Sequence, residues 1–184
     1  MAEEKRTTMA VDFGRLGFAY CTGDIAEWPP TVTNVVKLPP LEEFNTPTRA
    51  VHVAKLLIDE LPWVGEYVLE EQPAINRKTE LLQSAFAAFA TERGARVTSV
   101  TPHEIVREFP RLARAGDKKA AAIAESLSLL RGGVRTRPGC NVASKLAGKG
   151  RRHDMADALL MLVWYARREH GQLEAAPPKK RSKK

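Results

Sequence analysis

The sequence predicts an α/β protein in which a mixed β-sheet is flanked by helices. Two observations support this fold class. Three β-rich segments follow one another closely within residues 9–38, which is typical of an antiparallel meander. From residue 46 onward, helical and extended segments alternate, which is typical of a sheet with helices packed on its faces. The first three strands are therefore expected to be antiparallel, and the later strands are expected to join them in one mixed sheet.

The first third of the chain contains the three predicted strands and one helix. Strands are predicted at residues 9–12 and 18–21, which flank the sequence FGRLG, whose two glycines permit a hairpin bend. Residues 31–38, TVTNVVKL, form the third β-rich segment between two Pro-Pro pairs. A helix is predicted from Pro47 to residue 61, because its apolar residues recur at helical spacing and Pro62 follows it.

The rest of the chain alternates between the two types of element. Strands are predicted at residues 67–71 and 96–100, and helices at residues 78–93 and 117–130, with a short helix beginning at Pro102.

Residues 135–150 are polar and basic with three glycines and one proline, so a mobile loop is expected there. The last predicted helix begins at Arg151. Trp164 on this helix, and Trp63 earlier in the chain, are expected to lie in the core.

Length and composition indicate one globular domain. At 184 residues the chain fits the usual size range of a single domain. We assign residues 9–172 to this domain, residues 1–8 to a disordered lead and residues 173–184 to a basic disordered tail. No apolar run approaches the roughly 18–20 residues of a membrane span, so no membrane interaction is expected.

The net charge of +7 favours an anionic macromolecular partner and not a small-molecule substrate. The last eight residues, PPKKRSKK, carry five of the positive charges. Such a tail is a solvated arm, a nucleic-acid contact or a nuclear import signal. The two cysteines, Cys21 and Cys140, have no metal-binding spacing, which favours a reducing intracellular compartment. Mitochondrial, nuclear and viral-replication sites all remain open.

Acidic side chains at three places form the candidate active site. Asp12 ends an apolar strand, where packing does not explain a charge, and Glu70 and Glu71 end a second apolar strand. Asp154 and Asp157 are three residues apart at the start of the last helix, so they lie on the same side of it. Each acid alone has a structural explanation, since acids favour turns and the positive end of the helix dipole.

The acids would converge if the two strands are neighbours and the helix packs at their carboxyl ends. Converged carboxylates repel one another unless cations neutralise them. Mg²⁺ prefers carboxylate ligands, and two such ions in one site promote phosphodiester cleavage. The acidic residues therefore predict a metal-dependent nuclease site.

Three segments resemble the motifs of RuvC-type Holliday junction resolvases: AVDFGRLGFAYC, VLEEQP and RRHDMADALLML. They occur in the order of that family, are most similar to its poxvirus and fungal mitochondrial branch, and the resemblance spans most of residues 9–170. The resemblance implies an RNase H-like fold and Mg²⁺ or Mn²⁺ as cofactor, and two ions are expected per active site. It further implies a homodimer that binds branched DNA and makes paired symmetric nicks across a four-way junction. Such a protein acts in DNA recombination and repair.

The resemblance also implies roles for individual acids. Asp12 corresponds to the first catalytic acid and metal ligand, and Asp154 and Asp157 to the last two. The glutamate-x-glutamine pattern of the family selects Glu70 as the second acid. A family member with glutamate directly before glutamine would instead select Glu71.

Basic residues near these motifs are candidates for DNA binding. Lysines at the start of the helix near residue 117 would line the DNA path by resemblance, although a solvated helix face explains them equally well. Other basic residues could contact phosphates beside the acids. The candidates are Arg77, Lys78, Lys118, Lys119, Arg151 and Arg152. His153 is either a surface histidine or a residue that assists proton transfer or metal binding.

Two other functions fit the sequence. One is an RNase H-like nuclease similar to the YqgF group, which acts on RNA or branched DNA. The other is a nucleic-acid-binding module without catalysis, which the presence of all four acids disfavours. Cleavage of a four-way junction, compared with RNA or plain duplex, distinguishes the three.

Overall fold

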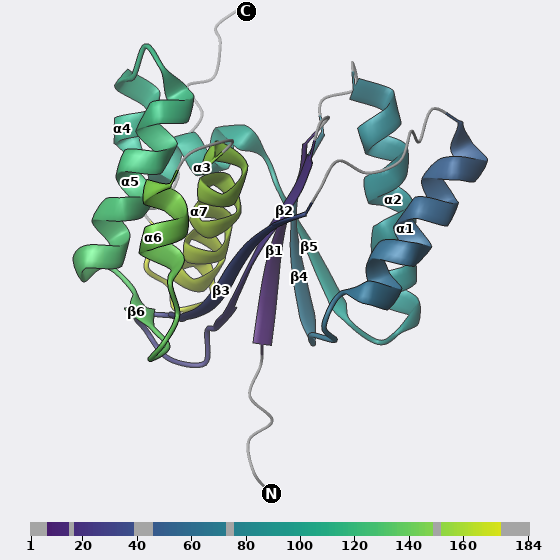
Figure 1. Cartoon of the computed structure of the whole chain (residues 1–184), viewed down its shortest axis with the longest axis horizontal. Helices are drawn as coiled ribbons and strands as arrows, with labels where there is room; N and C mark the ends of the chain where they lie inside the picture. The colour runs from purple at the N-terminus through teal and green to yellow at the C-terminus, as the bar shows by residue number, and fades with distance from the viewer. Residues whose placement is uncertain (1–6, 15–16, 39–45, 73–75, 149–151, 174–184) are drawn as a thin grey trace, which may run out of the picture.

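A mixed β-sheet forms the centre of the protein. The computed structural model describes residues 7–14, 17–38, 46–72, 76–148 and 152–173. Within them the sheet has six strands in the order β5-β4-β1-β2-β3-β6 (Figure 1). The strands are β1 (Thr7–Gly14), β2 (Gly17–Asp24), β3 (Thr31–Leu38), β4 (Glu66–Glu70), β5 (Arg96–Val100) and β6 (Arg135–Thr136). Strands β1, β2 and β3 pair antiparallel, whereas β4, β5 and β6 join in parallel, which confirms the predicted mixed sheet.

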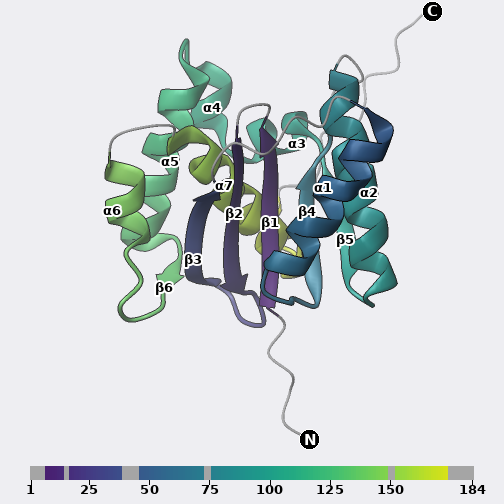
Figure 2. The same ribbon diagram turned by 45° about the vertical axis from the view of Figure 1, so that its right-hand side comes forward.

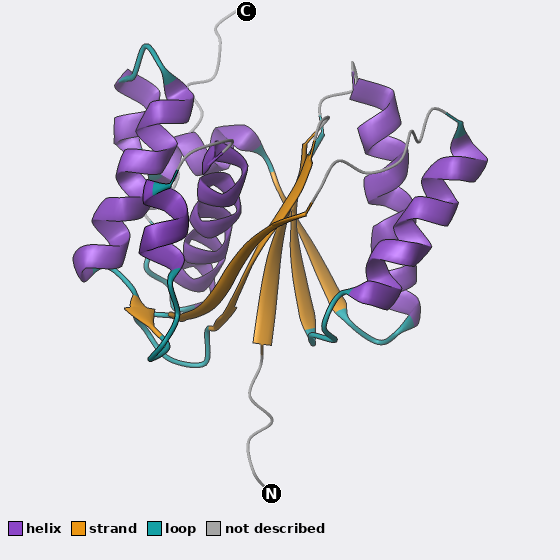
Figure 3. Cartoon of the chain, viewed as in Figure 1, coloured by secondary structure: helices purple, strands orange, loops and turns teal. Residues whose placement is uncertain are grey.

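Helices cover both faces of this sheet (Figures 1 and 3). One face is covered by α1 (Pro47–Glu60) and α2 (Arg77–Glu92). The other is covered by α3 (Pro102–Glu108), α4 (Pro110–Arg114), α5 (Lys118–Gly132), α6 (Val142–Ala147) and α7 (Arg152–Glu169). Figure 2 shows α7 crossing behind β1 and β2, which it contacts. Each face has its own apolar core, so the sheet separates two hydrophobic clusters.

The alternation of side chains along β1 sets the direction of each residue. Met9, Val11 and Phe13 belong to the core under α1 and α2, whereas Ala10 belongs to the core under α7. Because successive strand residues point to opposite faces, Asp12 points to the α7 face with Ala10.

Side-chain caps fix several helix starts that the sequence predicts. Thr46 accepts a hydrogen bond from the backbone N–H of Arg49 at 3.3 Å, and proline follows it. Thr101 and Glu104 form a reciprocal capping box at the start of α3. Asp117 accepts hydrogen bonds from the first backbone N–H groups of α5 at 3.0 and 3.1 Å.

The prediction of a loop over residues 135–150 was wrong for half of that segment, which contains β6 and α6. The Arg135 N–H donates to the Pro30 carbonyl at 2.9 Å, which adds a short strand to the free edge of β3. Val142 and Leu146, one helical turn apart, are buried on the side of α7. The polar composition of the segment hid these two apolar anchors. Residues 149 and 150 lie outside the described part of the chain.

One expectation about the core is wrong, and one helix was not predicted. Trp164 lies in the core, but Trp63 is 63% exposed in the segment that follows α1. The sequence also did not predict α4, which begins at a proline directly after α3.

The expected lead and tail fall largely outside the described residues. Strand β1 begins at Thr7, two residues inside the expected lead, and the description ends at residue 173. None of the described helices is long and apolar enough to cross a membrane.

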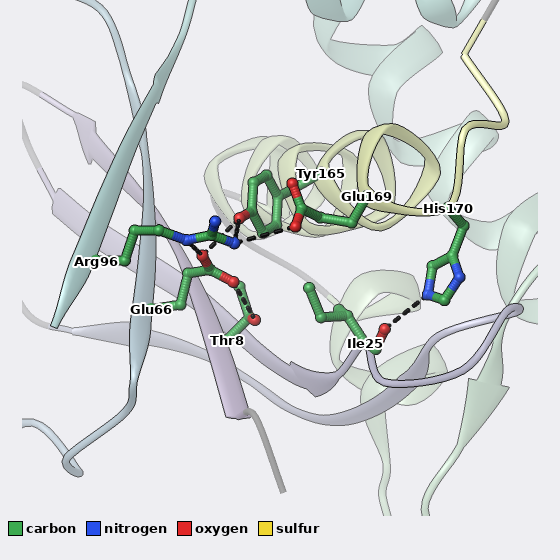
Figure 4. A network of polar contacts seen from close by, with 7 residues as sticks. All are labelled: Thr8, Ile25, Glu66, Arg96, Tyr165, Glu169 and His170. Carbon is green, nitrogen blue, oxygen red and sulfur yellow. Dashed lines mark hydrogen bonds and ion pairs between the residues drawn. The ribbon is translucent and has the colours of Figure 1, made fainter.

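The carboxyl-terminal half of α7 is held by a buried polar network (Figure 4). Glu66 at the start of β4 is buried, and its carboxylate accepts hydrogen bonds from the Tyr165 hydroxyl and the Arg96 guanidinium. Near the end of the helix, His170 Nε2 lies 2.8 Å from the carbonyl oxygen of Ile25. These contacts join α7 to strands β4 and β5 and to the end of β2, so they fix the rotation of the helix against the sheet. They thereby fix the direction of the side chains in its first turn.

A close approach between α7 and β2 provides a test of this packing. A methyl group on Gly23 would lie 2.7 Å from Leu162 Cδ2 and 3.0 Å from the Thr31 carbonyl oxygen. We therefore expect Gly23→Ala to lower the free energy of unfolding by about 1–3 kcal/mol, measured by urea denaturation. Gly132→Ala is the matched control, because a methyl group there meets nothing within 4 Å. The control should keep or slightly raise stability, and equal stabilities of the two variants would contradict the packing.

Candidate active site

Two neighbouring parallel strands position the first two carboxylates. The register pairs Val11 of β1 with Leu69 of β4, so Asp12 and Glu70 come next on adjacent strands at the same level. Val11 and Leu69 lie in the core under α1 and α2, and the two acids therefore point to the opposite face, toward α7. Asp12 is 7% exposed, and Glu70 is partly buried.

The first two turns of α7 supply the other two carboxylates. Asp154 is 7% exposed and Asp157 is partly buried. The negative charges of Glu70, Asp157 and Asp154 all act on Asp12. The structure thus brings together the four acids that the sequence singles out, and we call Asp12, Glu70, Asp154 and Asp157 the carboxylate cluster.

Glu71 does not belong to this cluster. Its side chain is exposed, and it follows Glu70 on a strand whose side chains alternate between faces. Its backbone N–H donates to the Val100 carbonyl at 2.7 Å, which continues the pairing of β4 with β5. Of the two candidates for the second acid, the geometry places Glu70 beside Asp12.

Burial and mutual repulsion change the acidity of the cluster. Burial, followed by the charges of Glu70, Asp157 and Asp154, raises the pKa of Asp12 well above its usual range. Burial, followed by the charges of Glu70 and Asp154, raises the pKa of Asp157 to about 7. Burial also raises the pKa of Glu70. The cluster therefore retains protons near neutral pH unless a cation neutralises it.

The cluster fits a hard divalent cation in the chemistry of its donors. Carboxylate oxygens are the ligands that Mg²⁺ and Mn²⁺ prefer, and closely spaced buried carboxylates are stabilised by such an ion. As the side chains lie, no three acidic, histidine or cysteine residues of the described chain form a ready metal-binding group. Binding would therefore require the carboxylates to turn toward a common point.

The carboxylate of Asp154 already has two partners. Lys37 of β3 forms an ion pair with its Oδ2 atom, and His153 Nε2 lies 2.8 Å from its Oδ1 atom. The sequence left two roles open for His153, a surface histidine or a residue that assists proton transfer or metal binding. It gave no indication of Lys37.

An irregularity in the sheet explains why Lys37 was missed. Two residues of β3, Thr33 and Asn34, lie opposite the single residue Thr22 of β2, so a β-bulge reverses the alternation of side chains. Strict alternation from the buried Val32 would send Lys37 to the α1–α2 face. Beyond the bulge, Val35 points to the α7 core, and Lys37 points to the same face.

The predicted DNA-binding residues lie in different surroundings. Lys119, at the start of α5, lies close enough to lower the pKa of Asp157 against the raising effects. Lys118, Arg77 and Lys78 are exposed in the first turns of α5 and α2. One guanidinium nitrogen of Arg152 lies 3.2 Å from the Ala147 carbonyl oxygen, at the end of α6. Arg151 lies outside the described residues.

The raised pKa of Asp157 predicts a pH-dependent stability of the metal-free protein. Between the unfolded value near 3.8 and the folded value of about 7, the folded state binds a proton that the unfolded state does not, so stability falls as pH rises through this interval. We expect Asp157→Asn to raise the free energy of unfolding by about 1–3 kcal/mol at pH 8 in EDTA, and by much less at pH 5. Glu71→Gln is the control and should change stability little at either pH. A destabilised Asp157→Asn protein at pH 8 would contradict the repulsion described here.

Comparisons with known proteins place the fold. No protein-family model and no curated protein sequence matches the chain. Among solved structures, the yeast mitochondrial Holliday junction resolvase Ydc2 matches with a TM-score of 0.69 and 16% identity, over 91% of this chain and 84% of that one. Thermus thermophilus RuvC matches with a TM-score of 0.60 and 13% identity, over 91% and 98% of the two chains. Fowlpox virus resolvase in complex with Holliday junction DNA matches with a TM-score of 0.57 and 14% identity, over 88% and 99%. The chain therefore has the RNase H-like fold of Holliday junction resolvases.

Proposed function

We propose that the protein is a metal-dependent endonuclease that resolves four-way DNA junctions. The observation that carries this proposal is the convergence of Asp12, Glu70, Asp154 and Asp157 on one face of a sheet that has the resolvase fold. A fold alone does not require four acids to be buried near one another at a cost in electrostatic energy. A site that binds cations does require such a group of acids. We further propose that residues 9–172 act as one nuclease domain.

Each cluster residue has a defined task in this proposal. Asp12 and Glu70, held on adjacent parallel strands, provide a rigid pair of carboxylates, and Asp154 and Asp157 complete the set from α7. They would hold one or two Mg²⁺ or Mn²⁺ ions, which when bound activate water and stabilise the leaving oxygen in phosphodiester hydrolysis. His153, which contacts Asp154, would orient that carboxylate. Lys119 would balance the negative charge at Asp157 and direct its ammonium group toward a phosphate.

Basic residues at the starts of α5, α2 and α7 would bind the DNA backbone. Lys118 and Lys119 project from the start of α5, and Arg77 and Lys78 from the start of α2, which follows the strand that carries Glu70. Contacts from such residues to phosphates position a nucleic acid without reading its sequence. Arg151 and Arg152, just before Asp154, complete this proposed path.

A homodimer would match the two-fold symmetry of a four-way junction. The layer of α1 and α2, with the segment after α1, is the proposed dimer surface, because it exposes several large apolar side chains. These are Val51, Leu56, Trp63 and Leu81.

Conservative substitutions of the cluster test the site. We expect Asp12→Asn, Glu70→Gln, Asp154→Asn and Asp157→Asn each to reduce cleavage of a labelled four-way junction at least about 100-fold, because each removes a charged metal ligand and keeps the shape. Junction binding should persist or become tighter, since a negative charge is lost near the phosphates. Glu71→Gln is the matched control and should cleave normally with Mg²⁺, as the wild-type protein should, and neither should cleave in EDTA.

Near-normal cleavage by Asp12→Asn would overturn the proposed site. Loss of activity only in Glu71→Gln would show that the register at the end of β4 is wrong. Equal cleavage of RNA or plain duplex would favour an RNase H-like nuclease of another specificity, and binding without cleavage would favour a non-catalytic module.

The proposed dimer predicts paired cuts. On a cruciform plasmid, two cuts within one complex give linear product, whereas single cuts give nicked circles. We expect linear product to dominate at saturating protein, with a dimer mass by light scattering. Trp63→Ser should shift both readouts toward the monomer and nicked circles if the α1–α2 surface forms the interface. A monomer that leaves only nicked circles would rule out paired resolution.

A further inference from the structure

We propose that Lys37 is a resident cation of the carboxylate cluster, which neutralises Asp154 in the metal-free protein and competes with the divalent cation for this carboxylate. The inference rests on the proposed function, because it concerns how the same site binds its metal. It assigns Lys37 as a positioning residue that sets metal affinity.

The strand register brings the lysine to the cluster. Lys37 of β3 lies opposite Ala19 of β2, and Ala19 lies opposite Asp12 of β1. The three residues therefore form one row across the α7 face of the sheet, about 10 Å long at the usual strand spacing. Ala19 is fully buried and has only a methyl side chain, so the long lysine side chain can extend over it toward the acids.

The β-bulge is what directs Lys37 to this face. Without the additional residue at Thr33 and Asn34, the side chain would point to the α1–α2 face, away from the carboxylate cluster. Bulges interrupt strand pairing and commonly re-aim a side chain next to an active site. Here the re-aimed side chain ends in an ion pair with Asp154.

The ion pair lies in the path of metal binding. The Lys37 ammonium contacts Asp154 Oδ2 and His153 contacts Asp154 Oδ1, so both carboxylate oxygens have partners. A cation that uses Asp154 as a ligand must compete with the ammonium group for the same electron pairs. Both side chains are largely buried, with 23% and 11% of their surfaces exposed, so water screens this competition only weakly. The charge of Lys37 also acts on Asp12, which is buried.

The test is Mn²⁺ binding by the full chain, measured by calorimetry and by the thermal midpoint in EDTA and in Mn²⁺. We expect Lys37→Gln and Lys37→Met to bind Mn²⁺ roughly tenfold more tightly than the wild-type protein, because an opposing charge is removed from a weakly screened site. Their thermal midpoints should be lower in EDTA and should rise more on adding Mn²⁺. A merely structural role would lower the midpoint equally in both conditions and leave the affinity unchanged.

Two matched variants control this comparison. Lys37→Arg keeps the charge and should keep an affinity near that of the wild-type protein. Lys145→Gln removes another lysine that binds β3. The Lys145 ammonium donates hydrogen bonds to the Asn34 side chain at 3.0 Å and to the Val35 carbonyl at 2.7 Å. Lys145→Gln can lower the midpoint but should not raise the affinity for Mn²⁺.

A measurement on the wild-type protein needs no variant to fold. Adding Mg²⁺ should increase acylation of Lys37 by a lysine-specific reagent several-fold relative to EDTA, measured by mass spectrometry with Lys145 as the internal reference. Unchanged Lys37 reactivity, or an unchanged or weaker Mn²⁺ affinity in Lys37→Gln, would overturn the inference alone if Asp12→Asn still abolishes Mn²⁺ binding. Absence of Mn²⁺ binding by the wild-type protein would overturn the proposed function and this inference together.

Discussion

The gathering of four acidic side chains in one poorly solvated site is the constraint on which the rest of this structure depends. Burial, followed by repulsion between the like charges, raises the pKa values of Asp12 and Asp157. The protein reduces this repulsion in two ways without a metal. It retains protons on the acids, and it places the ammonium groups of Lys37 and Lys119 nearby. Both arrangements leave a site that a divalent cation can stabilise further.

The sheet and α7 together hold these acids in place. Parallel pairing of β1 with β4 puts Asp12 and Glu70 side by side, and no loop is needed to bring them together. The position of Asp154 and Asp157 depends on the rotation of α7, which the buried contacts of Glu66 with Tyr165 and Arg96 determine at the other end of the helix (Figure 4). A rigid helix transmits this constraint along its length, so residues remote from the acids take part in building the site.

The two faces of the sheet have separate roles. The face under α7 contains the carboxylate cluster and the lysines that balance it, whereas the face under α1 and α2 contains an aromatic core around Phe13, Phe18 and Phe86. Successive residues of β1 point to opposite faces, so Asp12 lies on the α7 face and the next residue, Phe13, lies in the core under α1 and α2. The carboxylate cluster and the exposed apolar side chains of α1 and α2 therefore lie on opposite sides of the sheet.

Local signals in the sequence determined most of the strands and helices and the identity of the acids. Proline and side-chain caps mark helix starts, and an acid at the end of an apolar strand is visible without a structure. Only the tertiary structure showed that Glu70, and not Glu71, lies beside Asp12, because that depends on which face of β4 meets α7. It also showed that residues 135–147 fold, since backbone pairing with β3 and burial of two side chains outweigh a polar composition. Lys37 points to the site because of a β-bulge. A bulge depends on how two strands pair, so the sequence of one strand alone does not predict it.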